Sequence, residues 1–122
     1  MIVLKGKVKV GRKQGQRLGF PTINIAVSRL IKKDQWGIYF SLVKIGSKIY
    51  PGVTHLGPPK TFSLTHATCE THLFTVGGDF YGKTVEKRLI LKFREVKKFD
   101  KISELKKQIK EDIKDAKKFF GL

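Results

Sequence analysis

Roughly the first hundred positions of the chain form short runs rich in hydrophobic residues, a pattern typical of strands. Glycine-rich turn sequences such as Gly46-Ser47 and Gly77-Gly78-Asp79 separate these runs. Short strands at this spacing favour an antiparallel barrel or sandwich over a sheet built from βαβ units. The pattern predicts strands over residues 2–10, 22–26, 37–45, 48–55, 67–75 and 84–93.

The period of the apolar residues changes near the C-terminus, where they recur at steps of three and four. This spacing predicts one amphipathic helix over about residues 101–120. Asp100 or Ser103 is expected to cap its start and Gly121 its end. We therefore predict a mainly β protein with a single domain over residues 1–122, in which a small antiparallel barrel of about six strands (residues 1–99) is closed or buttressed by the helix. The apolar face of this helix comprises Ile102, Leu105, Ile109, Ile113, Ala116 and Phe120.

The composition narrows the class of protein. The 122 residues are 40% hydrophobic, which argues against a disordered chain, and Cys69 is the single cysteine, which excludes a disulfide scaffold. No apolar run approaches the ~20 residues of a membrane span, and the first residues are too short an apolar stretch for a signal peptide. We therefore expect a cytoplasmic protein that does not contact membranes.

The net charge is large. Lysine and arginine number 26 against 10 acidic residues, so the formal charge is +16. Such an excess favours polyanionic partners such as nucleic acid, an anionic membrane or phosphorylated small molecules. A lysine-coated surface without a specific partner explains the same number equally well. The helix shows this ambiguity, since its polar face mixes acids with Lys106, Lys107, Lys110, Lys114 and Lys117.

The segment 11–24, GRKQGQRLGFPTIN, carries the densest local signal. A loop rich in glycine and cations lets backbone N–H groups approach phosphates, although it is not a P-loop because no Gly-Lys-Ser/Thr follows. Pro21 favours an extended path, which places Thr22 and Asn24 on one face of the next strand. Their oxygens are hard ligands suited to Mg²⁺ held by nucleotide phosphates. The plainer interpretation is a basic turn followed by residues that bond to local backbone groups.

The run Leu18-Gly19-Phe20-Pro21-Thr22-Ile23-Asn24 resembles the Pro-Thr-Ala-Asn signature of riboflavin kinases, a domain that also forms the C-terminal half of bacterial bifunctional FAD synthetases. Ile23, His55 and Pro59-Lys60 depart from the family pattern, and the adenylyltransferase half is missing, so FAD synthesis is not expected. Further similarities follow in order along the chain: Gly37-Ile38-Tyr39, Gly52-Val53, Gly57, Thr61-Phe62, Glu70-Thr71-His72, Asp79-Phe80-Tyr81-Gly82-Lys83, Phe93-Arg94-Glu95, Phe99, Leu105 and Asp112.

The resemblance implies a riboflavin-kinase-like barrel and an ATP:riboflavin 5′-phosphotransferase that makes FMN from riboflavin and Mg²⁺-ATP. It implies that Glu70 is the general base for the ribityl 5′-hydroxyl, and His72 is expected to be a structural or orienting neighbour. The alternation places Glu70 and His72 on one face of their strand, and Cys69 and Thr71 on the other. Without the resemblance, an outward, solvated Glu70 would be the better interpretation.

The same resemblance assigns the remaining site residues. Thr22 and Asn24 are expected to contact Mg²⁺ and the nucleotide phosphates. On the flavin side it implies contacts from Arg94, Lys97 and Phe99, with Phe99 as a simple core residue the alternative. The expected partners are riboflavin, FMN, ATP and ADP, without membrane or specific nucleic acid, although weak non-specific polyanion binding fits the charge. The other nucleotide-binding residues expected are Gly11, Lys13, Gly15, Arg17 and Tyr81.

Two alternatives remain open at this point. A basic barrel can bind RNA or single-stranded DNA, which needs several exposed aromatic residues along a strand face. A flavin-binding domain without catalysis is the other, because the sequence Pro58-Pro59-Lys60 alters the family's loop. A nucleic-acid binder gives no reason for Thr22, Asn24 and Glu70 to occur together.

Overall fold

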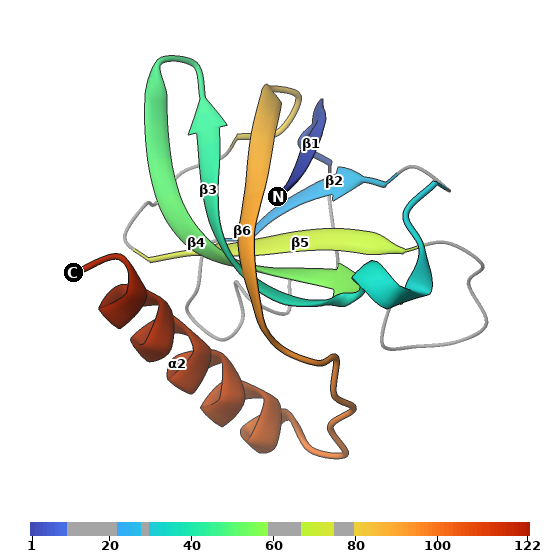
Figure 1. The fold of residues 1–122 in the computed structure, drawn as a ribbon, viewed down its shortest axis with the longest axis vertical. Coiled ribbons are helices and arrows are strands. Elements are labelled where there is room, and N and C mark those ends of the chain that lie inside the picture. The colour runs from blue at the N-terminus through green and yellow to red at the C-terminus, as the bar shows by residue number, and fades with distance from the viewer. Residues whose placement is uncertain (10–21, 28–29, 59–66, 75–79) are drawn as a thin grey trace.

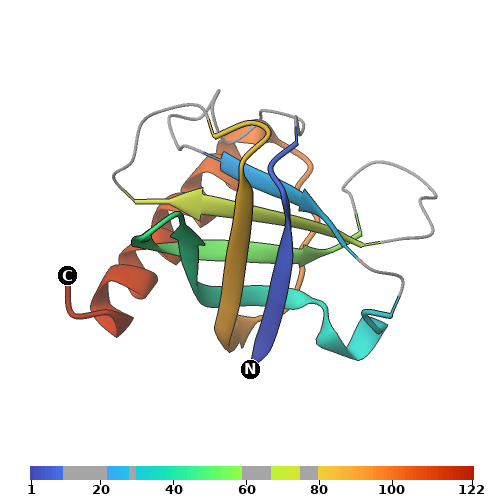
Figure 2. The same cartoon turned by 90° about the horizontal axis from the view of Figure 1, so that it is seen from above.

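The computed structural model describes residues 1–9, 22–27, 30–58, 67–74 and 80–122. Its six strands form one sheet in the order β1-β6-β3-β4-β5-β2, in which all neighbours are antiparallel. The sheet curls into a half-barrel (Figures 1 and 2), and a backbone bridge connects Lys9, in the segment after β1, to Asn24 of β2. The mainly β prediction is confirmed. The strands are β1 (Ile2–Lys7), β2 (Thr22–Ala26), β3 (Gly37–Ile45), β4 (Lys48–Gly57), β5 (Thr68–Leu73) and β6 (Thr84–Arg94).

The apolar runs located each of these strands, with small errors at the ends. β4 runs to Gly57, two residues beyond the predicted end, because it stays paired with β5 up to Thr68. β1 ends at Lys7, although the prediction extended it into the residues outside the description. The short 3-10 helix η1 (Lys33–Gln35) was not predicted. Its end is held by the Tyr39 hydroxyl, which donates a hydrogen bond to the Gln35 carbonyl.

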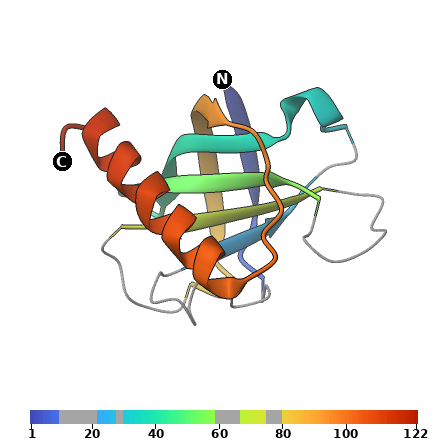
Figure 3. The same ribbon diagram turned by 90° about the horizontal axis from the view of Figure 1, so that it is seen from below.

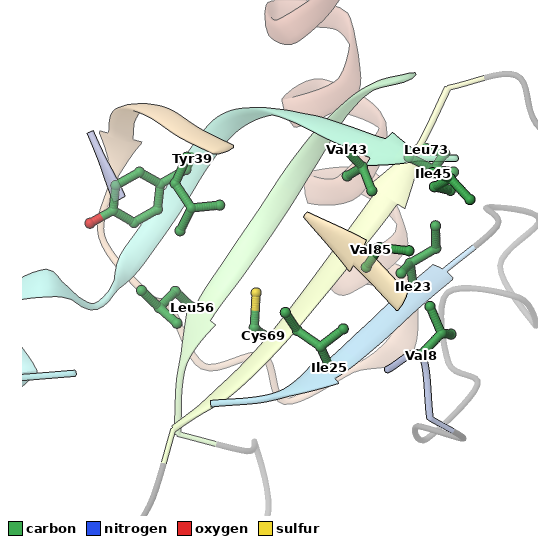
Figure 4. Packing of buried hydrophobic residues seen from close by; sticks show 11 residues of the cluster. Val8, Ile23, Ile25, Tyr39, Val43, Ile45, Leu56, Cys69, Leu73 and Val85 are labelled. Carbon is green, nitrogen blue, oxygen red and sulfur yellow. The ribbon is translucent and has the colours of Figure 1, made fainter. Parts of the chain in front are cut away.

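The inward side chains of the strands fill the barrel with one apolar core (Figure 4). Ile25, Val43 and Leu56 are fully buried there, beside the thiol of Cys69. Burial raises the pKa of the Cys69 thiol, because a thiolate is poorly solvated in such an interior. The alternation of β5 is as predicted, since Cys69 and Thr71 face this core. The cluster comprises Val8, Ile23, Ile25, Tyr39, Val43, Ile45, Leu56, Cys69, Leu73, Val85 and Leu89.

Helix α2 (Ile102–Phe119) packs on the outer face of the sheet and forms a second core with it. The helix crosses this face diagonally (Figure 3). The ring of Phe40 is central, because it stacks on Phe93 with 4.1 Å between centroids and on Phe119 with 4.6 Å. The buried members are Ile38, Phe40, Val53, Leu105, Ile109, Ile113 and Ala116. In the described part of the chain, no helix has both the length and the apolar character needed to cross a membrane.

The two ends of α2 differ in how well the sequence predicted them. Neither Asp100 nor Ser103 caps the start, because Lys101 occupies the N-cap position and makes no capping side-chain bond. Ile102 is also not part of the apolar face, since 64% of it is exposed. The C-terminal prediction is confirmed: Gly121 has φ +72°, a conformation that glycine adopts easily, and its N–H bonds to the Lys118 carbonyl.

Candidate active site

The strand register aligns four polar residues across the outer face of the sheet. Asn24 of β2 lies opposite Glu70 of β5, which lies opposite His55 of β4. Ile38 of β3 follows, and Arg94 of β6 lies opposite it. Residues directly opposite in a sheet point to the same face, so Asn24, Glu70, His55 and Arg94 form one polar row. With strands about 4.8 Å apart, Glu70 is one strand from Asn24 and three from Arg94.

Glu70 is at the centre of the predicted site, and its carboxylate is partly shielded, with 25% of the side chain exposed. Its Oε1 atom lies 3.5 Å from Nε2 of His72, whose side chain is 10% exposed. The two residues share the outer face, as predicted. A carboxylate that is neither fully buried nor fully solvated, beside an imidazole, can accept a proton from a bound hydroxyl group.

Gly52 allows β4 and β5 to approach each other beside this pair. A Cβ atom at Gly52 would lie 2.8 Å from the His72 carbonyl oxygen and 2.8 Å from Cγ2 of Thr71. Such distances are too short for real contacts, so a larger residue would push the two strands apart. The absence of a side chain at Gly52 therefore allows β4 and β5 to lie at their observed separation beside His72.

Thr22 and Asn24 bring oxygen atoms to the same edge of the row. Thr22 lies opposite His72, and Asn24, which is 8% exposed, lies opposite Glu70. Among the described residues, no group of three or more His, Cys, Asp and Glu side chains gathers to hold a metal ion. A hydroxyl and an amide oxygen fit Mg²⁺ that is already bound to phosphates better than they fit a metal enclosed by protein ligands.

The turn that carries Tyr81 lies beside the same edge. The Gly82 N–H donates to the Val8 carbonyl, and the next residue, Lys9, donates its N–H to the Asn24 carbonyl. These bonds connect the turn before β6 to β2 through two residues, and Tyr81 is exposed there. The structure thus brings Tyr81 towards Asn24. The predicted nucleotide-binding residues Gly11, Lys13, Gly15 and Arg17 lie outside the described residues.

At the other end of the polar row, Arg94 binds the helix. Its guanidinium donates to both carboxylate oxygens of Asp112, at 2.9 and 2.6 Å, and to the Glu95 carbonyl at 3.0 Å. The nearly buried Asp112 also accepts from Gln108. This bidentate pair fixes α2 to β6. The resemblance drew attention to both Arg94 and Asp112, but nothing in the sequence showed that they bind each other.

The two remaining residues predicted on the flavin side lie in the segment between β6 and α2. Phe99 packs against the outer core, and the ammonium of Lys97 lies 5.8 Å from the centroid of its ring. The contact of Phe99 with the core supports its interpretation as a packing residue.

Lys87 is a charged residue that the sequence analysis missed. Its side chain is fully buried inside the barrel, and its Nζ atom donates to the carbonyls of Ile23 at 2.6 Å and Cys69 at 3.2 Å. Burial lowers the pKa of this ammonium group. The sequence did carry one signal of this burial, because Lys87 falls on the same face of β6 as the apolar residues Val85 and Leu89.

The family comparison extends over almost the whole chain: residues 1–120 match the family model Flavokinase, described as riboflavin kinase. A bifunctional riboflavin kinase/FMN adenylyltransferase of Escherichia coli K12 is 34% identical over 120 residues, which cover 98% of this chain and 38% of that protein. The "RNA-binding riboflavin kinase RibR" of Bacillus subtilis 168 is 35% identical over 123 residues, which cover 100% of this chain and 53% of that protein. The chain therefore spans about half or less of these curated relatives.

Two solved structures resemble the fold. A crystal structure described as a macrolide-efflux protein from Streptococcus pneumoniae gives a TM-score of 0.81 at 28% identity, over 94% of this chain and 38% of that chain. The riboflavin kinase of Trypanosoma brucei gives a TM-score of 0.61 at 23% identity, over 98% of this chain and 76% of that chain. At that identity, the second likeness is evidence for the fold alone.

Proposed function

The chain belongs to the riboflavin kinase family, and we propose that it transfers the terminal phosphate of ATP to the 5′-hydroxyl of riboflavin, producing FMN and ADP. The observation that carries this proposal is the polar row. Glu70 lies between Asn24 and His55 on one face, with Thr22 and His72 in the next position along the same strands. A carboxylate beside oxygen donors suited to phosphate-bound Mg²⁺ is what phosphate transfer to an alcohol requires.

Glu70 is the general base in this proposal. Its carboxylate accepts the proton of the ribityl 5′-hydroxyl as the hydroxyl oxygen forms a bond to the γ-phosphorus of ATP. The bond between that phosphorus and the bridging oxygen breaks, and its electron pair leaves with ADP. His72, 3.5 Å from the carboxylate, holds Glu70 in orientation. A base of this kind contributes about 10²–10⁴-fold to the rate.

Thr22 and Asn24 hold the nucleotide phosphates and the Mg²⁺ bound to them. When present, Mg²⁺ offsets the negative charge of the phosphates during transfer. The side-chain oxygens of both residues are donors of the type that Mg²⁺ prefers. Tyr81 contacts the nucleotide from the neighbouring turn, and the basic residues Lys13 and Arg17, with Gly11 and Gly15, cover the phosphates.

The flavin lies beside the segment between β6 and α2 that carries Lys97 and Phe99, because the stretch of the outer face around Ile38 is already buried in the outer core. Phe99 offers a ring edge or face to the flat heterocycle, and Lys97 lies beside that ring. Three N–H groups of Arg94 are already used by Asp112 and Glu95, so Arg94 contributes mainly by positioning the helix and the segment that carries Lys97 and Phe99. Its remaining donors are available to polar atoms of the flavin.

Incubation of the protein with riboflavin, ATP and Mg²⁺, followed by chromatography, tests the proposal. We expect FMN to form in proportion to enzyme and time, and to require both ATP and Mg²⁺. Binding of riboflavin without FMN would instead identify a catalytically degenerate flavin-binding domain. Absence of both binding and product would refute the proposed function.

Nucleic-acid binding is a second candidate, favoured by the charge of +16 and by the exposed lysines of α2. The named RNA-binding relative gives it further weight. However, acidic residues such as Glu111 and Asp115 are interspersed along the helix and weaken its field. Non-specific affinity at physiological salt is typically ~10⁻⁴–10⁻⁶ M and falls steeply with added salt. We therefore expect weak, salt-sensitive binding through Lys106, Lys110, Lys114 and Lys117.

Fluorescence anisotropy with labelled RNA and DNA over a salt series distinguishes the two candidates. Weak binding that physiological salt removes, together with FMN formation, supports the kinase. Submicromolar, sequence-preferring binding at physiological salt, with no FMN formed, would assign the chain to nucleic-acid recognition. If the kinase proposal is correct, substitution of the four helix lysines by glutamine should leave FMN formation unchanged.

A further inference from the structure

Lys87 is a basic side chain in the interior of the barrel. It is 0% exposed, and the described part of the chain places no carboxylate within ion-pair distance of its Nζ atom. Its Nζ atom donates to two backbone carbonyls, those of Ile23 at 2.6 Å and Cys69 at 3.2 Å, and the side chain of Cys69 is a further partner. Its neighbours along the inner face of β6, Val85 and Leu89, belong to the apolar core.

Such a residue is unfavourable for stability alone. Removing an ammonium group from water costs free energy that carbonyl dipoles offset only in part. An unbranched apolar side chain such as methionine would fill similar space without that cost. Local departures of this kind, in which a charge replaces an apolar core residue, occur in proteins mainly where function requires them.

The two carbonyls that Lys87 binds belong to the strands that carry the proposed site. Ile23 lies between Thr22 and Asn24 on β2, and Cys69 immediately precedes Glu70 on β5. β6 is adjacent to neither strand in the sheet order, so the side chain of Lys87 reaches them across the interior of the barrel. One ammonium group thus connects the two strands from behind, while their outer faces present the oxygen donors and the carboxylate.

We propose that Lys87 is a positioning residue, which holds β2 and β5 at the relative setting that places Thr22 and Asn24 beside Glu70. This inference rests on the proposed kinase function. Lys87 does not touch substrate, and it acts through the backbone of Ile23 and Cys69. A small displacement of reacting groups by a distant change can lower a rate by as much as about 10²-fold.

The test compares Lys87→Met with Leu89→Met, a control at a buried position on the same face of the same strand. We expect Lys87→Met to lower kcat/KM for FMN formation by about 10- to 100-fold. Its thermal midpoint should equal or exceed that of the wild type. The control should retain wild-type kinetics. A parallel loss of stability and of folded protein, with unchanged kcat per folded molecule, would assign Lys87 a merely structural role.

Amide hydrogen exchange supplies a readout that does not depend on activity. In Lys87→Met we expect faster exchange confined to Thr22–Ala26 and Thr68–Leu73, with β3 unchanged. An equal increase in the exchange rate across the whole sheet, or no change in that rate, would overturn the proposal. If the wild type makes no FMN, the proposed function fails, whereas the exchange comparison still decides whether Lys87 holds the two strands. If Lys87→Met does not fold, Lys87→Gln, which keeps a hydrogen-bond donor without the charge, replaces it in the kinetic and exchange measurements.

Discussion

Two cationic side chains of β6 are shielded from water in different ways. Arg94, on the outer face, forms a bidentate pair with the nearly buried Asp112 and so joins the sheet to the helix. Lys87, on the inner face, donates to two backbone carbonyls. The first arrangement is explained by the architecture it fixes. Packing does not explain the second arrangement, because an apolar side chain would fill the position of Lys87 as well. Its explanation lies in the two strands whose carbonyls Lys87 binds.

The two faces of β5 also differ in how their polar groups are used. Inside the barrel, Thr71 belongs to a closed set of hydroxyl groups, since it bonds to Thr54 at 2.7 Å and Thr54 bonds to Ser41 at 2.5 Å. Outside, Glu70 lies among Asn24, His55 and His72, with a quarter of its side chain exposed. Polar groups that satisfy one another stabilise a fold, whereas polar groups left accessible on one face are available for chemistry.

The largest effect is expected where these two faces of β5 are compared directly. Glu70→Gln should lower kcat by about 10²–10⁴-fold, because the amide keeps the shape but cannot accept the proton. Riboflavin and nucleotide binding should change little. Thr71→Val, one residue away on the inner face, should leave kcat intact and reduce stability by about 1 kcal/mol. Steady-state kinetics and denaturant unfolding measure both, and more than a tenth of wild-type kcat in Glu70→Gln would exclude Glu70 as the base.

The pair between Arg94 and Asp112 provides the second test. Asp112→Ala leaves the shielded guanidinium without its carboxylate, so we expect a loss of about 3 kcal/mol in the free energy of unfolding. Asp115→Ala on the exposed side of the same helix is the matched control and should change stability little. Denaturant titration followed by circular dichroism gives both values. Equal stability of the two variants would show that the pair does not anchor α2.

Thr22 and Asn24 are expected to affect nucleotide affinity. Thr22→Val and Asn24→Leu each remove one oxygen donor while roughly keeping volume. A hydrogen bond to a charged group contributes about 1.5–3 kcal/mol, so each variant should bind Mg²⁺-ADP roughly tenfold or more weakly. Isothermal titration calorimetry measures the affinity, and circular dichroism confirms the fold. Unchanged affinity in both variants would move the phosphate site elsewhere.

A further expected effect is the pH dependence of stability that Lys87 introduces. Burial lowers the pKa of Lys87 from its ordinary value of 10.5, and Cys69 and Glu70 are the titratable groups that act on it. Between the lowered value and 10.5, the unfolded chain binds a proton that the folded protein does not. The wild type should therefore gain stability with rising pH in that window, relative to Lys87→Met. The raised pKa of the Cys69 thiol opposes this above 9.0 in both proteins, so the difference between the two unfolding curves is the quantity to measure.

Apolar runs bounded by turn residues, together with helical periodicity, were sufficient to predict the architecture, although β3 is buried on both faces because α2 covers its outer side. They also placed Glu70 and His72 together, since the spacing of two residues fixes the shared face. The alignment of Asn24, Glu70, His55 and Arg94 was beyond sequence reasoning, because it depends on the register of five strands. Lys87 was missed for a related reason: a lysine within an alternating strand is normally a solvated residue, and its carbonyl partners come from strands far along the chain.

The central claim is that riboflavin is phosphorylated on the outer face of β2 and β5. A crystal structure of the complex with riboflavin and Mg²⁺-ADP tests it most directly. We expect the ribityl 5′-oxygen within hydrogen-bond reach of the Glu70 carboxylate, about 2.6–3.2 Å or through one water molecule. The ADP phosphates should lie against Thr22 and Asn24. A flavin bound with its 5′-oxygen beyond that reach, or phosphates at another edge of the sheet, would contradict the account.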